Sequence, residues 1–246
     1  MKPRFVGRIG VADAVSAGNA SLGFLAVVTA PIDVGLSARL ILLAAVLDGL
    51  DGVLARRYGG TPSGEYLDSL ADVSSFAIAP AVLVATVGLQ QWSLAEGSVL
   101  AYAAVVVPAF FVAMAVIRLA LYTAYDTRDH HTEGVPTTLA ATILSAAALT
   151  AAGQPEVLLA ATAVFCYLMV STIEYPDLLA RDAIIMGVVH TLAVLFPAFY
   201  GKMFPWALLF LALAYLTLAP WFYWRDGEVD ADTCPDAAPE PVERTE

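Results

Sequence analysis

Four aspartates stand close together in an otherwise apolar part of the chain: Asp48, Asp51, Asp68 and Asp72. Residues three or four apart share one face of a helix, so each of the two pairs projects from a single face. A Gly-Gly-Thr-Pro turn at 59–62 separates the pairs and predicts a helix hairpin that brings the four carboxylates together. Such carboxylates repel one another unless a divalent cation holds them. Oxygen ligands without a nearby thiolate or imidazole favour Mg²⁺, Mn²⁺ or Ca²⁺ over zinc.

Small and cationic residues accompany these acids. Gly49, Gly52 and Ala55 leave the helix surface bare, which lets a flat ligand approach the backbone. Arg56 follows one turn after Gly52 and offers a guanidinium suited to a phosphate. Together these residues indicate a metal-bound nucleoside diphosphate site. The alternative, in which the acids only pair with Arg56 and Arg57, leaves four acids against two arginines.

The composition requires a membrane protein around this site. Of 246 residues, 59% are hydrophobic and 14% charged, and the mean hydropathy is +0.74. A soluble domain is about one-quarter charged, so this chain lacks the charge to cover a water-facing surface. Its apolar runs do not alternate as barrel strands do, which favours helices. The two cysteines, Cys166 in an apolar run and Cys234 in a polar tail, predict no disulfide.

The apolar runs predict an all-α polytopic protein with about eight membrane spans, since a span needs about 20 residues. The predicted spans are 12–30, 36–56, 66–88, 97–123, 136–152, 156–174, 181–200 and 204–224. With a cytoplasmic N-terminus, only Arg39 and Lys202 of the 12 Lys and Arg residues face the opposite side. This positive-inside bias predicts that both termini and the acidic site lie at the cytoplasmic face of the cell membrane. His190 lies within a span, and we expect it to be hydrogen-bonded inside the bundle.

Four regions follow from this pattern. We expect a cytoplasmic juxtamembrane segment at 1–11, a catalytic transmembrane core at 12–176, additional transmembrane helices at 177–224 and an acidic tail at 225–246. The tail has eight acidic and two basic residues and few large apolar ones, so we expect it to be disordered. The net charge of −11 and the excess of Arg over Lys are typical of proteins at high salt, which suggests a halophilic archaeon. A GC-rich genome also favours arginine.

The acidic segment resembles the signature of the CDP-alcohol phosphotransferases, D-x2-D-G-x2-A-R-x8-G-x3-D-x3-D. Its eight defining positions are filled here by Asp48, Asp51, Gly52, Ala55, Arg56, Gly64, Asp68 and Asp72. One departure lies in the glycine-rich turn, where seven residues instead of eight separate Arg56 from Gly64. The resemblance implies a six-helix catalytic core, here extended by a C-terminal helix pair, and a homodimer in the membrane.

The resemblance also implies the chemistry of the acids. Asp48, Asp51 and Asp68 would hold one or two Mg²⁺ or Mn²⁺ ions. Asp72 would contact the metal and act as the base that takes a proton from the acceptor hydroxyl. The hydroxyl would attack the phosphorus that carries the lipid, and CMP would leave with its charge stabilised by the metal and Arg56.

Other residues would bind the substrates in such an enzyme. Gly52 and Ala55 would line the cytidine site, and Gly64 would allow close approach of the nucleotide. Asn19, in the first span, is similar to an asparagine that lies near the nucleotide in this family. An inter-helix hydrogen bond is the alternative for Asn19. Arg118 would hold the carboxylate of an amino-acid acceptor, or else extend to the cytoplasmic interface.

The wider sequence is similar to that of bacterial and archaeal phosphatidylserine synthases. Residues 67–81 fit their D-S-x-A-D-x-x-[ST]-F-x-x-A-P run, and shorter fragments extend the resemblance over about residues 10–176. These synthases usually carry R-L-A-R-F-N where residues 118–123 read R-L-A-L-Y-T. The resemblance implies transfer from a CDP-lipid, CDP-archaeol in an archaeon, to L-serine.

Two other interpretations stay open at this point. Within the same chemistry, the acceptor is inositol phosphate, glycerol phosphate or glycerol. A phosphorylated acceptor requires more cationic groups near the acids than Arg57, Arg118 and Arg128 provide. In a different class, a cation channel or transporter would use the intramembrane carboxylates as its pathway. It leaves Gly52 and Ala55 at these positions unexplained, and neither interpretation involves nucleic acid.

Overall fold

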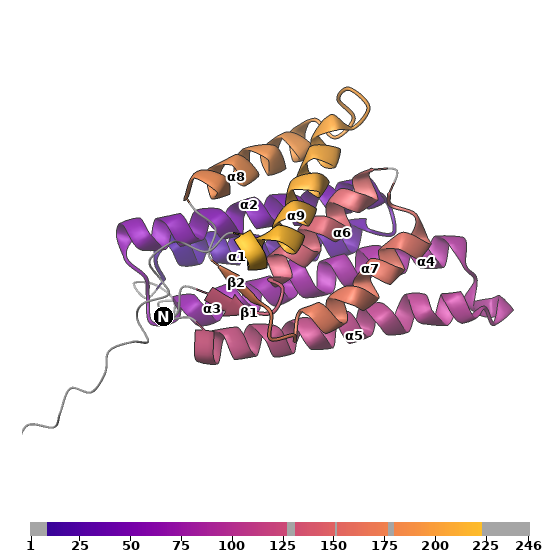
Figure 1. Cartoon of the computed structure of the whole chain (residues 1–246), viewed down its shortest axis with the longest axis horizontal. Coiled ribbons are helices and arrows are strands. Elements are labelled where there is room, and N and C mark those ends of the chain that lie inside the picture. Colours follow the sequence, from indigo (N-terminus) through magenta and orange to yellow (C-terminus); the bar gives the residue numbers. More distant parts are fainter. Residues whose placement is uncertain (1–8, 127–130, 151, 177–179, 223–246) are drawn as a thin grey trace, which may run out of the picture.

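The computed structural model describes residues 9–126, 131–150, 152–176 and 180–222. Most of them lie in long helices that run side by side (Figure 1). These are α1 (Val11–Thr29), α2 (Val34–Tyr58), α3 (Gly64–Asp72), α4 (Ala79–Gln91), α5 (Val99–Leu121), α6 (Thr137–Leu149), α7 (Pro155–Leu168), α8 (Ala180–Leu195) and α9 (Met203–Phe222). Two short strands, β1 (His131–Glu133) and β2 (Glu174–Pro176), pair antiparallel. The predicted all-α polytopic membrane protein is confirmed.

The helices differ in their ability to cross a bilayer. Among the described residues, four helical stretches are long and apolar enough: Val11–Thr29, Gly64–Gln91, Val99–Ala124 and Met203–Trp221. Helix α2 has 25 residues but carries the charged residues of the site. Helices α6 and α7 have 13 and 14 residues. At 1.5 Å per residue each is about 20 Å long, against the roughly 30 Å of a bilayer core, so both are shorter than the predicted spans.

The third predicted span is one continuous rod with an irregular centre. Helices α3 and α4 join through a π-helical segment, Val73–Ile78, that begins directly after Asp72. There the Ser75 hydroxyl donates to the backbone carbonyl of Asn19 at 2.8 Å, which holds the rod against α1. Gly23 permits this contact, because a Cβ atom at Gly23 would lie 2.7 Å from the backbone carbon of Ser74. No sequence pattern indicated the π-helical segment.

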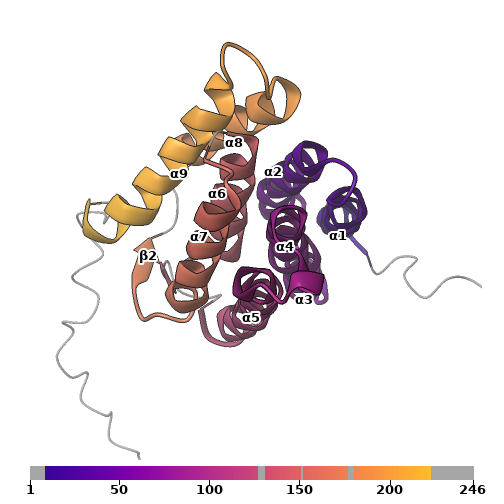
Figure 2. The same cartoon turned by 90° about the vertical axis from the view of Figure 1, so that its right-hand side faces the viewer.

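The helices form two groups around a common core. Viewed along the bundle, α1 to α4 lie on one side and α6 to α9 on the other (Figure 2). Helix α6 is buried along almost its whole length and packs on both α2 and α9. Helix α8 packs on α2 and α9, so the C-terminal helix pair is an integral part of the bundle. The predicted acidic tail at 225–246 and most of the juxtamembrane segment lie outside the described residues.

Candidate active site

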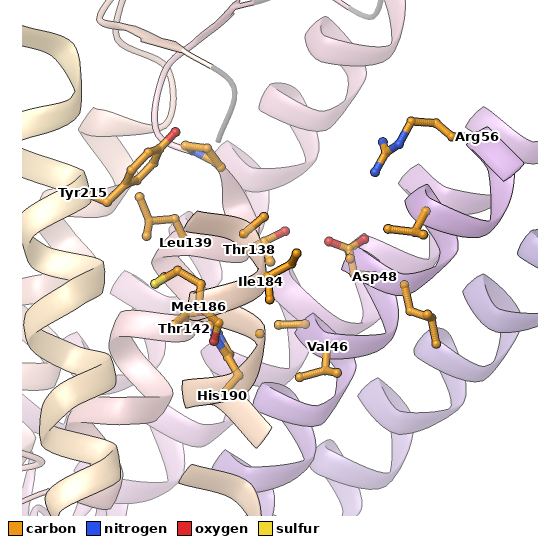
Figure 3. Close-up of a pocket in the computed structure, with 17 residues that line it drawn as sticks. Val46, Asp48, Arg56, Thr138, Leu139, Thr142, Ile184, Met186, His190 and Tyr215 are labelled. Atoms are coloured by element: carbon orange, nitrogen blue, oxygen red, sulfur yellow. The ribbon is translucent and has the colours of Figure 1, made fainter. Parts of the chain in front are cut away.

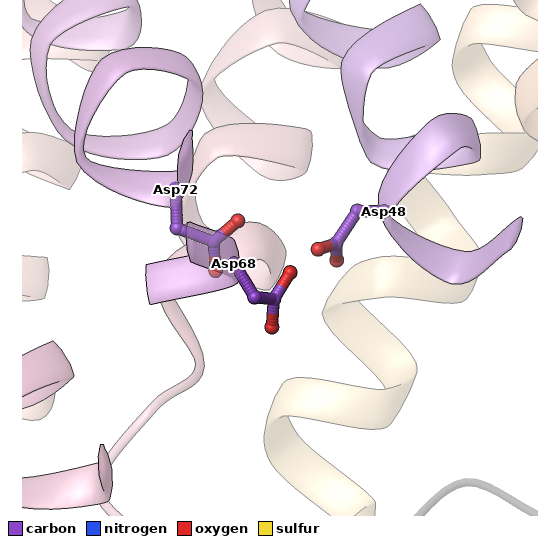
Figure 4. A group of neighbouring side chains, drawn as sticks. All are labelled: Asp48, Asp68 and Asp72. Carbon is purple, nitrogen blue, oxygen red and sulfur yellow. The ribbon is translucent and has the colours of Figure 1, made fainter. Parts of the chain in front are cut away.

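Three carboxylates converge where α2 faces α3. Asp48 comes from α2, and Asp68 and Asp72 come from α3 (Figure 4). One oxygen from each lies within 4.8 Å of the others. The Oδ1 atom of Asp68 is buried and accepts no hydrogen bond from the residues that the structure describes. Three carboxylates, one of which has this buried oxygen without a hydrogen bond, fit a hard divalent cation. Such a cation would also offset the repulsion between the carboxylates.

Asp51, the fourth predicted acid, lies next to this cluster and outside it. It is 6% exposed, and its Oδ2 atom accepts a hydrogen bond from the Ser16 hydroxyl at 2.7 Å. Ser16 comes from α1, so this bond links the first helix to the acidic face of α2. The sequence offered no signal for Ser16 beyond a small polar residue on an apolar helix.

Asn19 contacts the acids from the opposite side. It is fully buried, and its Nδ2 atom donates a long hydrogen bond of 3.5 Å to Asp72 Oδ1. It is not among the residues that line the two cavities described below. In this structure Asn19 therefore makes the inter-helix hydrogen bond that was the alternative to a nucleotide contact.

A polar cavity of about 290 Å³ lies on one side of the acids. Asp51, Gly52, Ala55, Gly64 and Asp68 line it, together with residues of α1 and the turn after α2. The turn is possible because Gly59, which ends α2, has a φ of +87°, a conformation that glycine adopts readily. Gly52, Ala55 and Gly64, which the sequence associates with a nucleotide, thus border the same polar cavity.

Asp13 also lines this polar cavity, although the sequence pattern did not predict it. It is 3% exposed, and its Oδ2 atom accepts hydrogen bonds from the Gly10 backbone at 2.9 Å and the Thr61 hydroxyl at 2.7 Å. These bonds fix the turn between α2 and α3 to the start of α1. The available signal was an acid in the first turn of the first helix.

A second, mostly apolar cavity of about 570 Å³ lies between α2, α6 and α8, with Tyr215 of α9 at its edge (Figure 3). Asp48 and Arg56 of α2 stand together at one side of it. The Arg56 guanidinium lies over Gly52, where a Cβ atom would be 3.6 Å from Nη1. Because Asp48 borders this cavity and Asp68 the polar one, the acidic cluster lies between the two.

Arg118 is enclosed by protein and does not extend to the interface, which corrects that alternative. Its side chain is 7% exposed, its Nη2 atom donates to Thr132 of β1 at 3.1 Å, and its guanidinium lies 5.0 Å from the Tyr122 ring centroid. Its positive charge also acts on the Asp72 carboxylate. Arg118 is thus held near the acids by a strand that the sequence did not predict.

The neighbouring departure from the synthase pattern also contacts the site. Thr123, where the synthases usually have asparagine, lies with its hydroxyl 2.6 Å from the hydroxyl of Ser69. Ser69 follows Asp68 directly on α3, so this hydrogen bond ties the π-helical turn Tyr122–Asp126, which continues α5, to the acidic helix.

Comparison with known proteins agrees with this geometry. Residues 10–173 match the model of the CDP-alcohol phosphatidyltransferase family. The match spans well over half of the chain, so the chain belongs to this family of enzymes. Membership removes the channel or transporter interpretation.

Individual relatives are similar over different lengths. The chain is 33% identical over 175 residues to the archaetidylserine synthase of Methanothermobacter thermautotrophicus, which covers 68% of this chain and 70% of that protein. It is 45% identical over 69 residues to the CDP-diacylglycerol–serine O-phosphatidyltransferase of Mycobacterium leprae, or 28% of this chain and 23% of the relative. The Mycobacterium tuberculosis enzyme of the same description is 40% identical over 86 residues, or 35% and 27% of the two chains.

Proposed function

We propose that this enzyme transfers the phosphatidyl or archaetidyl group of a CDP-lipid to the hydroxyl of L-serine and releases CMP. The observation that carries the proposal is the acidic cluster between a polar cavity walled by small residues and an apolar cavity. A nucleotide fits the first and a lipid the second, which leaves the pyrophosphate beside Asp48, Asp68 and Arg56. The halophilic composition and the archaeal relative favour CDP-archaeol as the donor.

In the proposed reaction the acidic residues hold the metal, and Asp72 also acts as the base. Asp48, Asp68 and Asp72, with Asp51 beside them, would hold Mg²⁺ or Mn²⁺, in one or two ions, which would neutralise charge on the pyrophosphate. Asp72 takes the proton of the acceptor hydroxyl, and its hydrogen bond to Asn19 fixes the carboxylate for that step.

The bond changes then follow from the placement of the substrates. The acceptor oxygen forms a new bond to the lipid-bearing phosphorus, and the bond from that phosphorus to CMP breaks. Arg56 stays paired with phosphate oxygens and offsets the charge on the departing CMP.

Serine is favoured as the acceptor by the surroundings of Asp72. Arg118 is buried, its charge acts on the Asp72 carboxylate, and its guanidinium suits an acceptor carboxylate. Of the described arginines, Arg56 lines the apolar cavity beside Asp48 and the charge of Arg118 acts on Asp72, whereas Arg57 lies against the Tyr58 ring. Inositol phosphate or glycerol phosphate would require additional cationic groups, and glycerol has no carboxylate for Arg118 to bind.

Location and assembly complete the proposal. We place the site at the cytoplasmic face of the cell membrane, with both termini on that side, because of the positive-inside bias. The catalytic core is residues 12–176, with 177–224 as added transmembrane helices, and the working unit is a homodimer.

Mass spectrometry of the lipid product tests the reaction. Purified protein would receive CDP-archaeol, Mg²⁺ or Mn²⁺ and, in parallel, labelled serine, glycerol phosphate, inositol phosphate or glycerol, with Asp72→Asn as the inactive control. We expect a serine-labelled lipid and CMP that are absent from the control. A product from another alcohol would refute the acceptor, and no product from any alcohol would refute the proposed function.

A further inference from the structure

The apolar cavity has two chemically different ends. Asp48, Arg56 and Thr138 face each other at one end, and the remaining lining is almost entirely hydrocarbon from α2, α6 and α8 (Figure 3). Its volume of about 570 Å³ is in the range of small-molecule sites. Ile184 lines it and is 67% exposed, so the cavity opens at the surface of the bundle. An amphiphile with a charged head fits this distribution of groups.

The polar side chains deeper in the cavity are already hydrogen-bonded within the protein. The Nδ1 atom of His190 donates to the Met186 carbonyl at 2.8 Å, which leaves Nε2 of the neutral ring to accept from the Thr142 hydroxyl at 3.2 Å. The Tyr215 hydroxyl donates to the backbone carbonyl of Pro176 at 2.7 Å. This agrees with the expectation that His190 is bonded within the bundle. Beyond its charged end, the cavity therefore exposes mainly hydrocarbon to a bound ligand.

Small residues of α8 keep this space open. Ala183 and Gly187 are one helical turn apart and both line the cavity. A Cβ atom at Gly187 would meet no atom within 4 Å, so a side chain there would enter the cavity without displacing the backbone. Helix α8 begins at Ala180, after the family match ends at residue 173, so this wall is an addition to the family core.

We infer that α8 is the selectivity wall for the hydrocarbon chains of the CDP-lipid, which lie between α2, α6 and α8 with the phosphates beside Asp48 and Arg56. The inference rests on the proposed function and gives the added helix pair a role in it. Gly187 determines how much chain volume the wall admits. Filling the position should therefore weaken the binding of long chains far more than that of short ones, since short chains need less of the cavity.

Steady-state kinetics with two donors tests this inference. CMP release would be measured on the full-length enzyme with long-chain CDP-dioleoylglycerol and short-chain CDP-dioctanoylglycerol, using whichever acceptor supports turnover. For Gly187→Phe we expect KM for the long-chain donor to rise by about tenfold or more and kcat to change little. The short-chain KM should change by less than about threefold, and Gly187→Ala should lie between Gly187→Phe and the wild type.

The matched control is Ile185→Phe, which adds a ring on α8 at a residue that does not line the cavity. Ile185 is 43% exposed and does not line the cavity, so both donors should behave as with the wild type. Equal KM values for wild type and Gly187→Phe would overturn the inference, as would an equal rise for both donors.

A direct binding measurement separates this inference from the proposed function. Native mass spectrometry would count the CDP-dioleoylglycerol retained by wild type and Gly187→Phe, whether or not any acceptor turns over. Lower retention by Gly187→Phe with an unchanged melting temperature would support the wall even if serine proved to be the wrong acceptor. Equal retention would refute it even if serine transfer were established.

Discussion

Replacing Asp68 by asparagine should stabilise the protein without metal and remove its stabilisation by metal. Oxygens of Asp48, Asp68 and Asp72 lie within 4.8 Å of one another. At that distance each pair of charges repels by about 3.5 kcal/mol at an effective dielectric constant of about 20. Asp68→Asn abolishes two of the three pairs, so the relief for fully ionised carboxylates is about 7 kcal/mol, and proton uptake by the wild type reduces it. In EDTA the variant should therefore melt at a higher temperature.

Mg²⁺ should narrow this difference in melting temperature. Binding at about one hundred times Kd stabilises a folded protein by about 2.7 kcal/mol. For a chain of this size that corresponds to roughly 5–10 °C in Tm. The wild type should show this rise, and Asp68→Asn should show almost none because a ligand is missing.

Thermal unfolding in detergent, followed by tryptophan fluorescence with EDTA or Mg²⁺, measures both effects. Asp33→Asn is the control, because Asp33 caps α2 through a 3.0 Å bond from the Leu36 backbone and asparagine caps equally well. Its response to Mg²⁺ should match that of the wild type. If Asp68→Asn melted below the wild type in EDTA and gained as much from Mg²⁺, the three carboxylates would not form a cation site.

Three further substitutions probe the surroundings of the acids. Arg118→Lys should raise KM for serine by about tenfold and leave KM for the CDP-lipid unchanged, because an ammonium cannot form the paired hydrogen bonds of a guanidinium; equal KM values in initial-rate assays would contradict its role at the acceptor. Asn19→Ala should lower kcat by about tenfold with little change in KM, because it removes the hydrogen bond to the Asp72 carboxylate. A change confined to the KM for the CDP-lipid would indicate a nucleotide contact instead. Gly23→Ala should destabilise the protein by about 1–3 kcal/mol because its Cβ atom would overlap Ser74; an unchanged Tm would show that α1 and the π-helical segment separate easily.

The acidic hairpin was predictable because its information is local. The spacing of Asp48, Asp68 and Asp72 fixes the helix faces they occupy, and the glycine-rich turn reverses the chain between them. The apolar runs likewise predicted the order and approximate bounds of the helices. A run of about 20 apolar residues identifies a membrane span by its composition alone.

Other features depended on contacts between distant segments. The burial of Arg118 follows from its bond to Thr132, whose strand pairs with residues more than forty positions later in the chain. Asp51 faces Ser16, 35 residues away, and Asn19 faces Asp72, 53 residues away. No local pattern encodes such partners, since a buried polar group is satisfied by whichever helix packs against it.

The sequence by itself determined the membrane environment, the helical class and the carboxylate pairs, because hydropathy and helical periodicity act over a few turns of chain. Only the tertiary structure decided that Asp48 and Asp68 border different cavities, and that α8 provides a wall for one of them. The reason is physical: a cavity is the space that packed helices leave unfilled. Its shape depends on how α2, α6 and α8 approach one another, and no single segment contains that information.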